Sequence, residues 1–227
     1  MPDLDALVHH QLVRGLIDQG RVPTNGELAD ALKATPEAIE ASLRRLHDGH
    51  GLVLHPHRPE PWVIHPFATS PTLTWVAQHS RGWWSPCIWC GLGVATLVGG
   101  EVTIQSRLGG ESSDITIRCR DGNVHDSDLW AHFPEPPRFA WGNVHHFCAR
   151  LLPFARREDV LPWAERHGFV PGQVLPLAQL ADLARRWYGR HADRDWHKWT
   201  VAEAADIFRE AGLTGPFWSL DARAGTY

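Results

Sequence analysis

The hydrophobic pattern of this chain changes its period near residue 67, and this change constrains the fold more than any other feature of the sequence. Before that point, apolar residues recur every three or four positions, which is typical of helices with one buried face. After it, short segments alternate apolar and polar residues between glycine-containing turns, as strands do, and helical periods return toward the end of the chain. We therefore predict an α+β protein in which an N-terminal module at residues 1–66 packs on a mixed sheet and helix domain at residues 67–227.

The N-terminal module has the element order of a winged helix, with three helices followed by two strands. The second helix opens with a capping box, Thr24 to Glu27, in which each side chain bonds the backbone N–H of the other residue. The third helix opens with Thr35 ahead of a proline, which suits the first helical position. Segments 52–54 and 62–64 are apolar and flank a long turn, so we predict a hairpin there.

The charge of this module argues against the DNA binding that a winged helix suggests. It carries six Arg and Lys against nine Asp and Glu, and the predicted third helix opens with Glu37 and Glu40 where base contacts would be made. The whole chain has a formal net charge of −4, so it lacks the positive field that a polyanion requires. We therefore expect no nucleic-acid partner.

Three features predict a cytoplasmic protein with no membrane contact. No apolar run approaches the roughly 18 residues that a membrane-spanning helix needs. The N-terminus lacks the basic and then apolar layout of a secretory signal. At 227 residues the chain can build its core without disulfide bonds, so we expect its four cysteines to be thiols in a reducing compartment.

The cysteines all lie in the middle of the chain, where we expect the chemistry. Cys87 and Cys90 form a C-x-x-C element ahead of a small-residue apolar segment that is predicted as a buried helix. Cys119 falls on the apolar face of a predicted β-hairpin, where a packing role is the simpler interpretation. Cys148 lies in an apolar stretch at residues 144–152 that we predict to be a buried strand.

Three chemistries compete for these thiols. A zinc site would take all four as a tetrahedron, but only the first pair has the spacing that zinc ribbons repeat. A redox dithiol is expected to have its C-x-x-C at the start of a helix that follows a strand in a βαβ unit. The sequence around Cys87 and Cys90 does not have this βαβ pattern. The third possibility is a thiolate site for a soft metal, in which cysteines far apart in the sequence converge on one ion.

Two short motifs carry a family resemblance that favours the third possibility. The sequence WCGL at residues 89–92 heads the apolar helix, an alternating hairpin follows, and FC at residues 147–148 comes about sixty residues later. Behind a winged-helix-like module, this layout resembles the alkylmercury lyases (organomercurial lyases), which use one cysteine in a W-C-x-L-D type motif and a second in an F-C motif. The resemblance covers most of the chain in layout, and it matches the two functional cysteines to Cys90 and Cys148.

The resemblance implies protonolysis of a carbon–mercury bond without an organic cofactor. Cys90 and Cys148 would bind the mercury, and Cys87 is a candidate third thiolate. The substrate would be a small organometallic or apolar compound, and the Trp-rich surroundings of the cysteines suit a pocket for an apolar group. Mercury, or another thiophilic ion, would stay on the cysteines until small thiols or a mercury-accepting protein removed it.

One departure leaves the enzymatic assignment open. The family's aspartate, three residues after the first cysteine, supplies the proton, and this chain has Gly93 there. An active enzyme would need another donor, for which Cys87, His145 and His146 are candidates. The alternative is a protein that binds a soft metal without cleaving carbon–metal bonds, or a lyase homologue with another task. A further alternative is a thiol- or metal-sensing winged-helix regulator.

Overall fold

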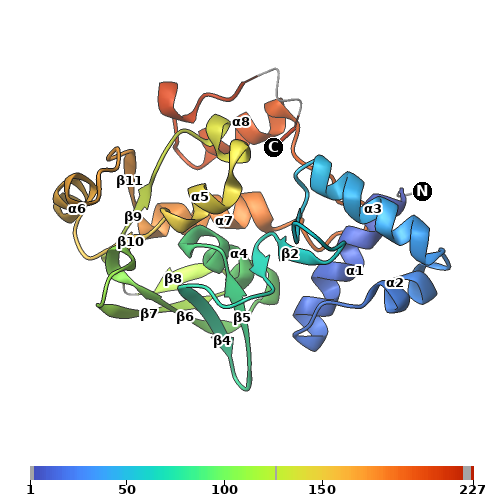
Figure 1. The fold of residues 1–227 in the computed structure, drawn as a ribbon. Helices are drawn as coiled ribbons and strands as arrows, with labels where there is room; N and C mark the ends of the chain where they lie inside the picture. Colours follow the sequence, from blue (N-terminus) through green and yellow to red (C-terminus); the bar gives the residue numbers. More distant parts are fainter. Residues whose placement is uncertain (1–2, 126, 222–225) are drawn as a thin grey trace.

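The computed structural model describes residues 3–125, 127–221 and 226–227, without the side chains of residues 141 and 142. Figure 1 shows an N-terminal group of helices beside a long antiparallel sheet, with further helices lying across that sheet. Within the described residues the helices are α1 (Leu4–Gln19), α2 (Asn25–Leu32), α3 (Pro36–Asp48), α4 (Ile88–Val98), α5 (Val144–Ala149), α6 (Val160–His167), α7 (Leu177–Tyr188) and α8 (Val201–Glu210).

The strands form two antiparallel sheets. The order in the larger sheet is β1-β2-β3-β5-β4-β6-β7-β8, and in the smaller one β10-β9-β11. The strands are β1 (Val53–Leu54), β2 (Pro61–Ile64), β3 (Phe67–Ala68), β4 (Thr74–Gln78), β5 (Arg81–Ser85), β6 (Glu101–Arg107), β7 (Asp114–Arg120), β8 (Asn123–His125), β9 (Trp130–Phe133), β10 (Pro153–Phe154) and β11 (Gln173–Pro176). This architecture confirms the predicted α+β class.

The N-terminal three-helix module forms as predicted from its capping motifs. Thr24 and Glu27 make both bonds of the capping box at the start of α2. The module is tied to the large sheet by a buried hydrogen bond, in which the indole N–H of Trp83 on β5 donates to the carbonyl of Leu16 on α1 at 2.7 Å. Indole N–H groups need such a partner when they are buried. Trp83 therefore joins the module to the sheet.

The predicted hairpin of the N-terminal region forms and continues into the large sheet. β1 and β2 pair through Val53 and Val63, and Val63 also pairs with Ala68 on β3. The second predicted hairpin forms as β6 and β7, in which Cys119 lies opposite Val102 with its side chain buried. The expected boundary between residues 66 and 67 thus falls inside a run of paired strands.

Helix α4 lies between the large sheet and α7, and both neighbours approach it closely (Figure 1). Its sequence is apolar around the whole circumference, as expected of a helix that is covered on several sides. Glycines permit the approach on each side. A Cβ at Gly91 would lie 2.9 Å from the side chain of Thr74 on β4, and a Cβ at Gly93 would overlap the ring of Tyr188 on α7.

The prediction of a buried strand at residues 144–152 was wrong, because Val144–Ala149 form helix α5. The side chain of Asn143 caps this helix by accepting a hydrogen bond from the backbone N–H of His146 at 3.0 Å. The apolar residues of the stretch recur at positions 144, 147, 148 and 151, which is a helical period. The adjacent pair His145 and His146 obscured this period in the sequence.

The helical periods expected toward the end of the chain are confirmed as α6, α7 and α8. A 3₁₀ turn at residues 157–159 precedes α6. Among the described residues, no helix combines the length and the apolar character needed to cross a membrane.

Candidate functional site

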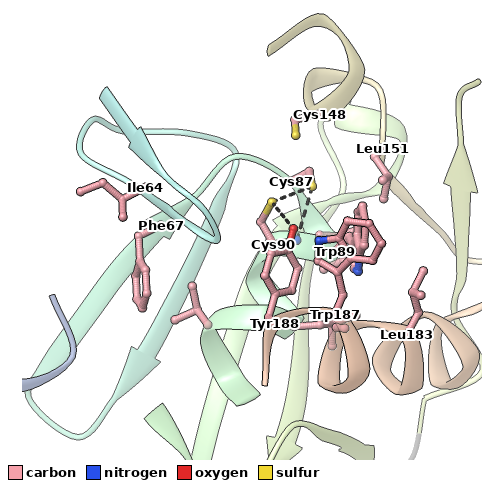
Figure 2. Close-up of a cluster of buried hydrophobic side chains, with 14 of the residues drawn as sticks. Ile64, Phe67, Cys87, Trp89, Cys90, Cys148, Leu151, Leu183, Trp187 and Tyr188 are labelled. Carbon is pink, nitrogen blue, oxygen red and sulfur yellow. Dashed lines mark hydrogen bonds between the residues drawn. The ribbon is translucent and has the colours of Figure 1, made fainter. Parts of the chain in front are cut away.

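Two of the cysteines sit at the start of α4 because Cys87 caps that helix. The sulfur of Cys87 accepts a hydrogen bond from the backbone N–H of Cys90 at 3.4 Å, as an N-cap residue does. The thiol of Cys87 also donates to the sulfur of Cys90 at 3.4 Å (Figure 2). The N-terminus of a helix stabilises negative charge, so the first turn of α4 favours a thiolate on a cysteine placed there.

Helix α5 brings the third sulfur to the same place. The sulfur atoms of Cys87, Cys90 and Cys148 all lie within 4.8 Å of one another, and all three side chains are buried (Figure 2). Two metal–sulfur bonds of about 2.3 Å each span roughly this separation, so the three sulfurs are close enough for one soft ion. The structure thus brings together the residues that the resemblance placed at one site.

Cys119 is not part of this group. It lies on β7 at the far end of the hairpin pairing, and burial raises the pKa of its thiol to about 12. Its side chain is buried in the hydrophobic core, which agrees with the packing role that the sequence favoured. None of the four cysteines forms a disulfide bond.

Hydrogen bonds to the sulfur of Cys90 lower the pKa of its thiol. Burial alone would raise the pKa of its thiol, but hydrogen bonds from Cys148 and Cys87 to its sulfur outweigh burial. His65 contributes a further hydrogen bond, and the pKa of Cys90 lies well below the ordinary value. The pKa of Cys87 is raised by burial, and that of Cys148 by its hydrogen bonds to the other two sulfurs. These pKa shifts favour a thiolate at Cys90 and protonated thiols at Cys87 and Cys148.

Two residues beside Cys90 were missed in the sequence. His65, in the turn between β2 and β3, places Nδ1 3.9 Å from the sulfur of Cys90. Tyr188, the last residue of α7, places its hydroxyl oxygen 3.5 Å from the same sulfur. These partners lie 25 and 98 residues from Cys90, so no local motif links them to it. The only hint in the sequence concerned Tyr188, which is one of just two tyrosines in the chain.

Position 93 and Tyr188 are sterically linked. A Cβ at Gly93 would lie 2.3 Å from Cδ2 and 2.7 Å from Cγ of Tyr188. Real Cβ atoms do not approach another carbon so closely, so a side chain at position 93 is incompatible with the ring in its present place. The glycine is thus the residue that lets Tyr188 reach Cys90.

The other proposed proton donors are placed differently. Cys87 lies within the sulfur group. His145 is half-buried with its ring 4.7 Å from that of Trp62, and it lines a hollow that also contains Cys148. His146 is exposed on the outer side of α5. Of these two histidines, only His145 borders the site.

An aromatic pocket opens beside the sulfur group. Cys148 and Tyr188 line it together with several large rings, and the lining also includes four basic side chains, His50, His65, His191 and Lys198. The tryptophans among these rings are Trp89, Trp187, Trp196 and Trp199. A second hollow also borders Cys148, and its lining includes Cys87 and His145. No described residue lining either cavity is an Asp or Glu.

The comparisons with known proteins identify the family of the chain. The model of the alkylmercury lyase family (MerB) matches residues 67–189, which is more than half of the chain. This protein therefore belongs to the alkylmercury lyase family. A solved structure titled "Crystal structure of the mercury-bound form of MerB2" has the same fold, with a TM-score of 0.67 and 17% identity over 84% of this chain and 93% of the other. No curated protein matches the chain.

Proposed function

We propose that this protein cleaves carbon–mercury bonds by protonolysis, with Cys90 and Cys148 taking the mercury. The observation that carries the proposal is the convergence of sulfurs from α4 and α5 within 4.8 Å in a buried site. Thiolate sulfur is the ligand that a soft ion such as mercury prefers. Membership of the alkylmercury lyase family supports the same chemistry.

The charge distribution gives the cysteines an order of action. Cys90, whose pKa is held well below the ordinary value, is the nucleophile that first binds R–Hg⁺. The thiol of Cys148, whose pKa is raised, bonds to the mercury as the carbon–mercury bond breaks. The net reaction joins R–Hg⁺, the Cys90 thiolate and the Cys148 thiol into R–H and a Cys90–Hg–Cys148 bridge. Mercury remains divalent throughout, so no oxidant or reductant is needed.

Cys87 and the aromatic pocket complete this proposal. Cys87 is a third sulfur for the ion, because its sulfur belongs to the same group. The rings beside Cys148 offer an apolar wall to the organic group of the substrate. Small thiols or a mercury-accepting protein then remove the ion from the cysteines by ligand exchange.

The second candidate function is retention of a soft ion without cleavage. The observation that favours it is the lining of the two cavities, in which no described residue is a carboxylic acid. Three sulfurs can hold an ion without any proton donor. The two candidates differ in one product, because only cleavage releases a hydrocarbon.

Benzene release from phenylmercury in the presence of excess small thiol tests the proposal. We expect turnover by the wild type and none by Cys90→Ser or Cys148→Ser. Cys119→Ser is the matched control, because this cysteine is buried outside the group, and we expect it to retain turnover. Mercury retention by the wild type without benzene would favour the second candidate. Turnover by Cys90→Ser at the wild-type rate would contradict the proposal.

A further inference from the structure

We infer that the Tyr188 hydroxyl delivers the proton to the leaving carbon, so that a phenol performs the acid step of this site. The inference rests on the proposed function above and names a further catalytic residue for it. Its basis is the position of one hydroxyl group relative to the sulfur that first binds mercury. Figure 2 shows the Tyr188 side chain rising from α7 toward Cys90.

The reaction restricts where a donor can be. A carbon atom on a mercury that is bonded to Cys90 lies only a few ångströms from that sulfur, and a donor must be within hydrogen-bond reach of the carbon. The Tyr188 hydroxyl oxygen is 3.5 Å from the sulfur of Cys90. It also lines the aromatic pocket in which we place the organic group. Tyr188 thus lies beside both the mercury ligand and the leaving group.

The other protic neighbours of Cys90 have other tasks. Cys87 and Cys148 are the sulfurs that take the ion. His65 is farther away, at 3.9 Å, and its hydrogen bond lowers the pKa of Cys90, which keeps the nucleophile charged. His65 also lines the aromatic pocket, so the experiment below includes it as the competing donor.

The tyrosine ring is held in place before any substrate arrives. Its face packs on the backbone of α4 at Gly93, where a Cβ would lie 2.3 Å away. The rings of Trp89 and His191 lie 5.5 Å and 5.0 Å from it, centroid to centroid. A donor that is fixed in position loses little entropy when the reaction occurs. The absence of a side chain at Gly93 therefore helps to hold the phenol in position.

The step balances without a further reactant. The carbon–mercury bond of R–Hg–S(Cys90) breaks with its electron pair on carbon, and that carbon takes the proton from the Tyr188 oxygen. The sulfur of Cys148 bonds to mercury, and its proton passes to the phenolate of Tyr188. The phenol is regenerated, and the products are R–H and mercury on two sulfurs.

Tyr188→Phe tests the inference, since it keeps the packed ring and removes only the hydroxyl. In a single turnover with phenylmercury, we expect benzene release to slow by about 100-fold or more, the range that a positioned acid supplies. We also expect the intact mass of the variant to include the phenyl group, because capture proceeds and cleavage stalls. Binding of Hg²⁺ added alone should equal that of the wild type, since all three sulfurs remain.

Two controls separate the inference from its alternatives. Tyr227→Phe removes the chain's other phenol, which lines the same pocket and whose oxygen accepts a hydrogen bond from the backbone N–H of Asp221 at 2.8 Å. Accumulation of the phenyl adduct on this variant, together with normal turnover by Tyr188→Phe, would assign the acid step to Tyr227 and overturn the inference. His65→Gln should slow capture at neutral pH without accumulating the phenyl adduct. Accumulation of that adduct on His65→Gln, together with normal turnover by Tyr188→Phe, would overturn the inference.

The inference and the proposed function fail in different ways. Equal benzene release by Tyr188→Phe and the wild type would refute the role of Tyr188 and leave the cleavage activity intact. If the wild type itself released no benzene, the proposed function would be wrong and the inference would fall with it.

Discussion

The ring of Tyr188 fills the space that a side chain at position 93 would need, with Cδ2 only 2.3 Å from the position of a Cβ there. Helices α4 and α7 can pack at this distance only because one of the two facing residues has no side chain. The contact fixes the phenol beside Cys90, so a steric feature of helix packing also sets the chemistry of the site.

Gly93→Ala should destabilise the protein, because the added methyl group overlaps the ring of Tyr188. Overpacking of this kind costs about 1–3 kcal/mol, measured as the free energy of unfolding in denaturant. Gly26→Ala in α2 is the matched control. Its Cβ would meet nothing closer than 3.9 Å, and alanine is the better helix former. Equal stability of the two variants would contradict the contact.

His65→Phe should raise the pKa of Cys90, because it removes one of the hydrogen bonds that hold the thiolate. The wild type should capture organomercury at pH values well below the ordinary range of a thiol, and the lower limb of its capture rate against pH should move to higher pH in the variant. The exposed His57→Gln variant should leave the profile unchanged. An unshifted lower limb in His65→Phe would show that His65 does not stabilise the Cys90 thiolate.

Cys87→Ala should weaken mercury retention, whereas Cys119→Ala should not. The sulfur of Cys87 lies within the 4.8 Å group, and the buried Cys119 lies outside it. We expect external thiols to remove Hg²⁺ faster from Cys87→Ala than from the wild type, with Cys119→Ala at the wild-type rate. Identical removal rates in all three proteins would mean that two sulfurs alone hold the ion.

Buried histidines should make the fold sensitive to acid. Burial holds the pKa of His9 well below the ordinary value and that of His191 at about 3. Below about pH 6.5 these histidines bind protons in the unfolded chain but stay neutral in the folded protein. Their contribution to the free energy of unfolding is therefore fully present above that pH and is lost as the pH falls. Each histidine contributes a slope of at most about 1.4 kcal/mol per pH unit.

His9→Phe isolates one of these contributions. The ring of His9 stacks on Trp196 at 3.5 Å, and neither of its nitrogens has a hydrogen-bond partner within the described part of the chain. Phenylalanine keeps the stack and removes the titrating group. The free energy of unfolding should therefore fall less steeply between about pH 6 and 4 in the variant. A slope equal to that of the wild type would show that His9 takes no part.

The sequence predicted the features that depend on local pattern. The capping box at Thr24, the hairpin that carries Cys119, and the buried helix after Cys90 each follow from residues close together in the chain. The convergence of Cys90 and Cys148 was expected only through the resemblance, since no periodicity links α4 to α5.

The rest of the site depends on tertiary contacts that no local pattern encodes. Tyr188 meets Cys90 across 98 residues because α7 packs on α4 at a glycine. In the sequence, Gly93 indicated only that the family's aspartate is absent. In the structure, the ring of Tyr188 occupies the space that a side chain at position 93 would need. The error at α5 arose from a short apolar stretch, for which helix and strand are hard to distinguish by period.

The most direct test of the account is a single turnover of phenylmercury by the wild-type protein without external thiol, followed by benzene release and intact protein mass. The account predicts an equivalent of benzene for each protein and a mass increase of a mercury ion without its phenyl group. A protein that gains mercury with the phenyl group still attached, and releases no benzene, would contradict cleavage at this site.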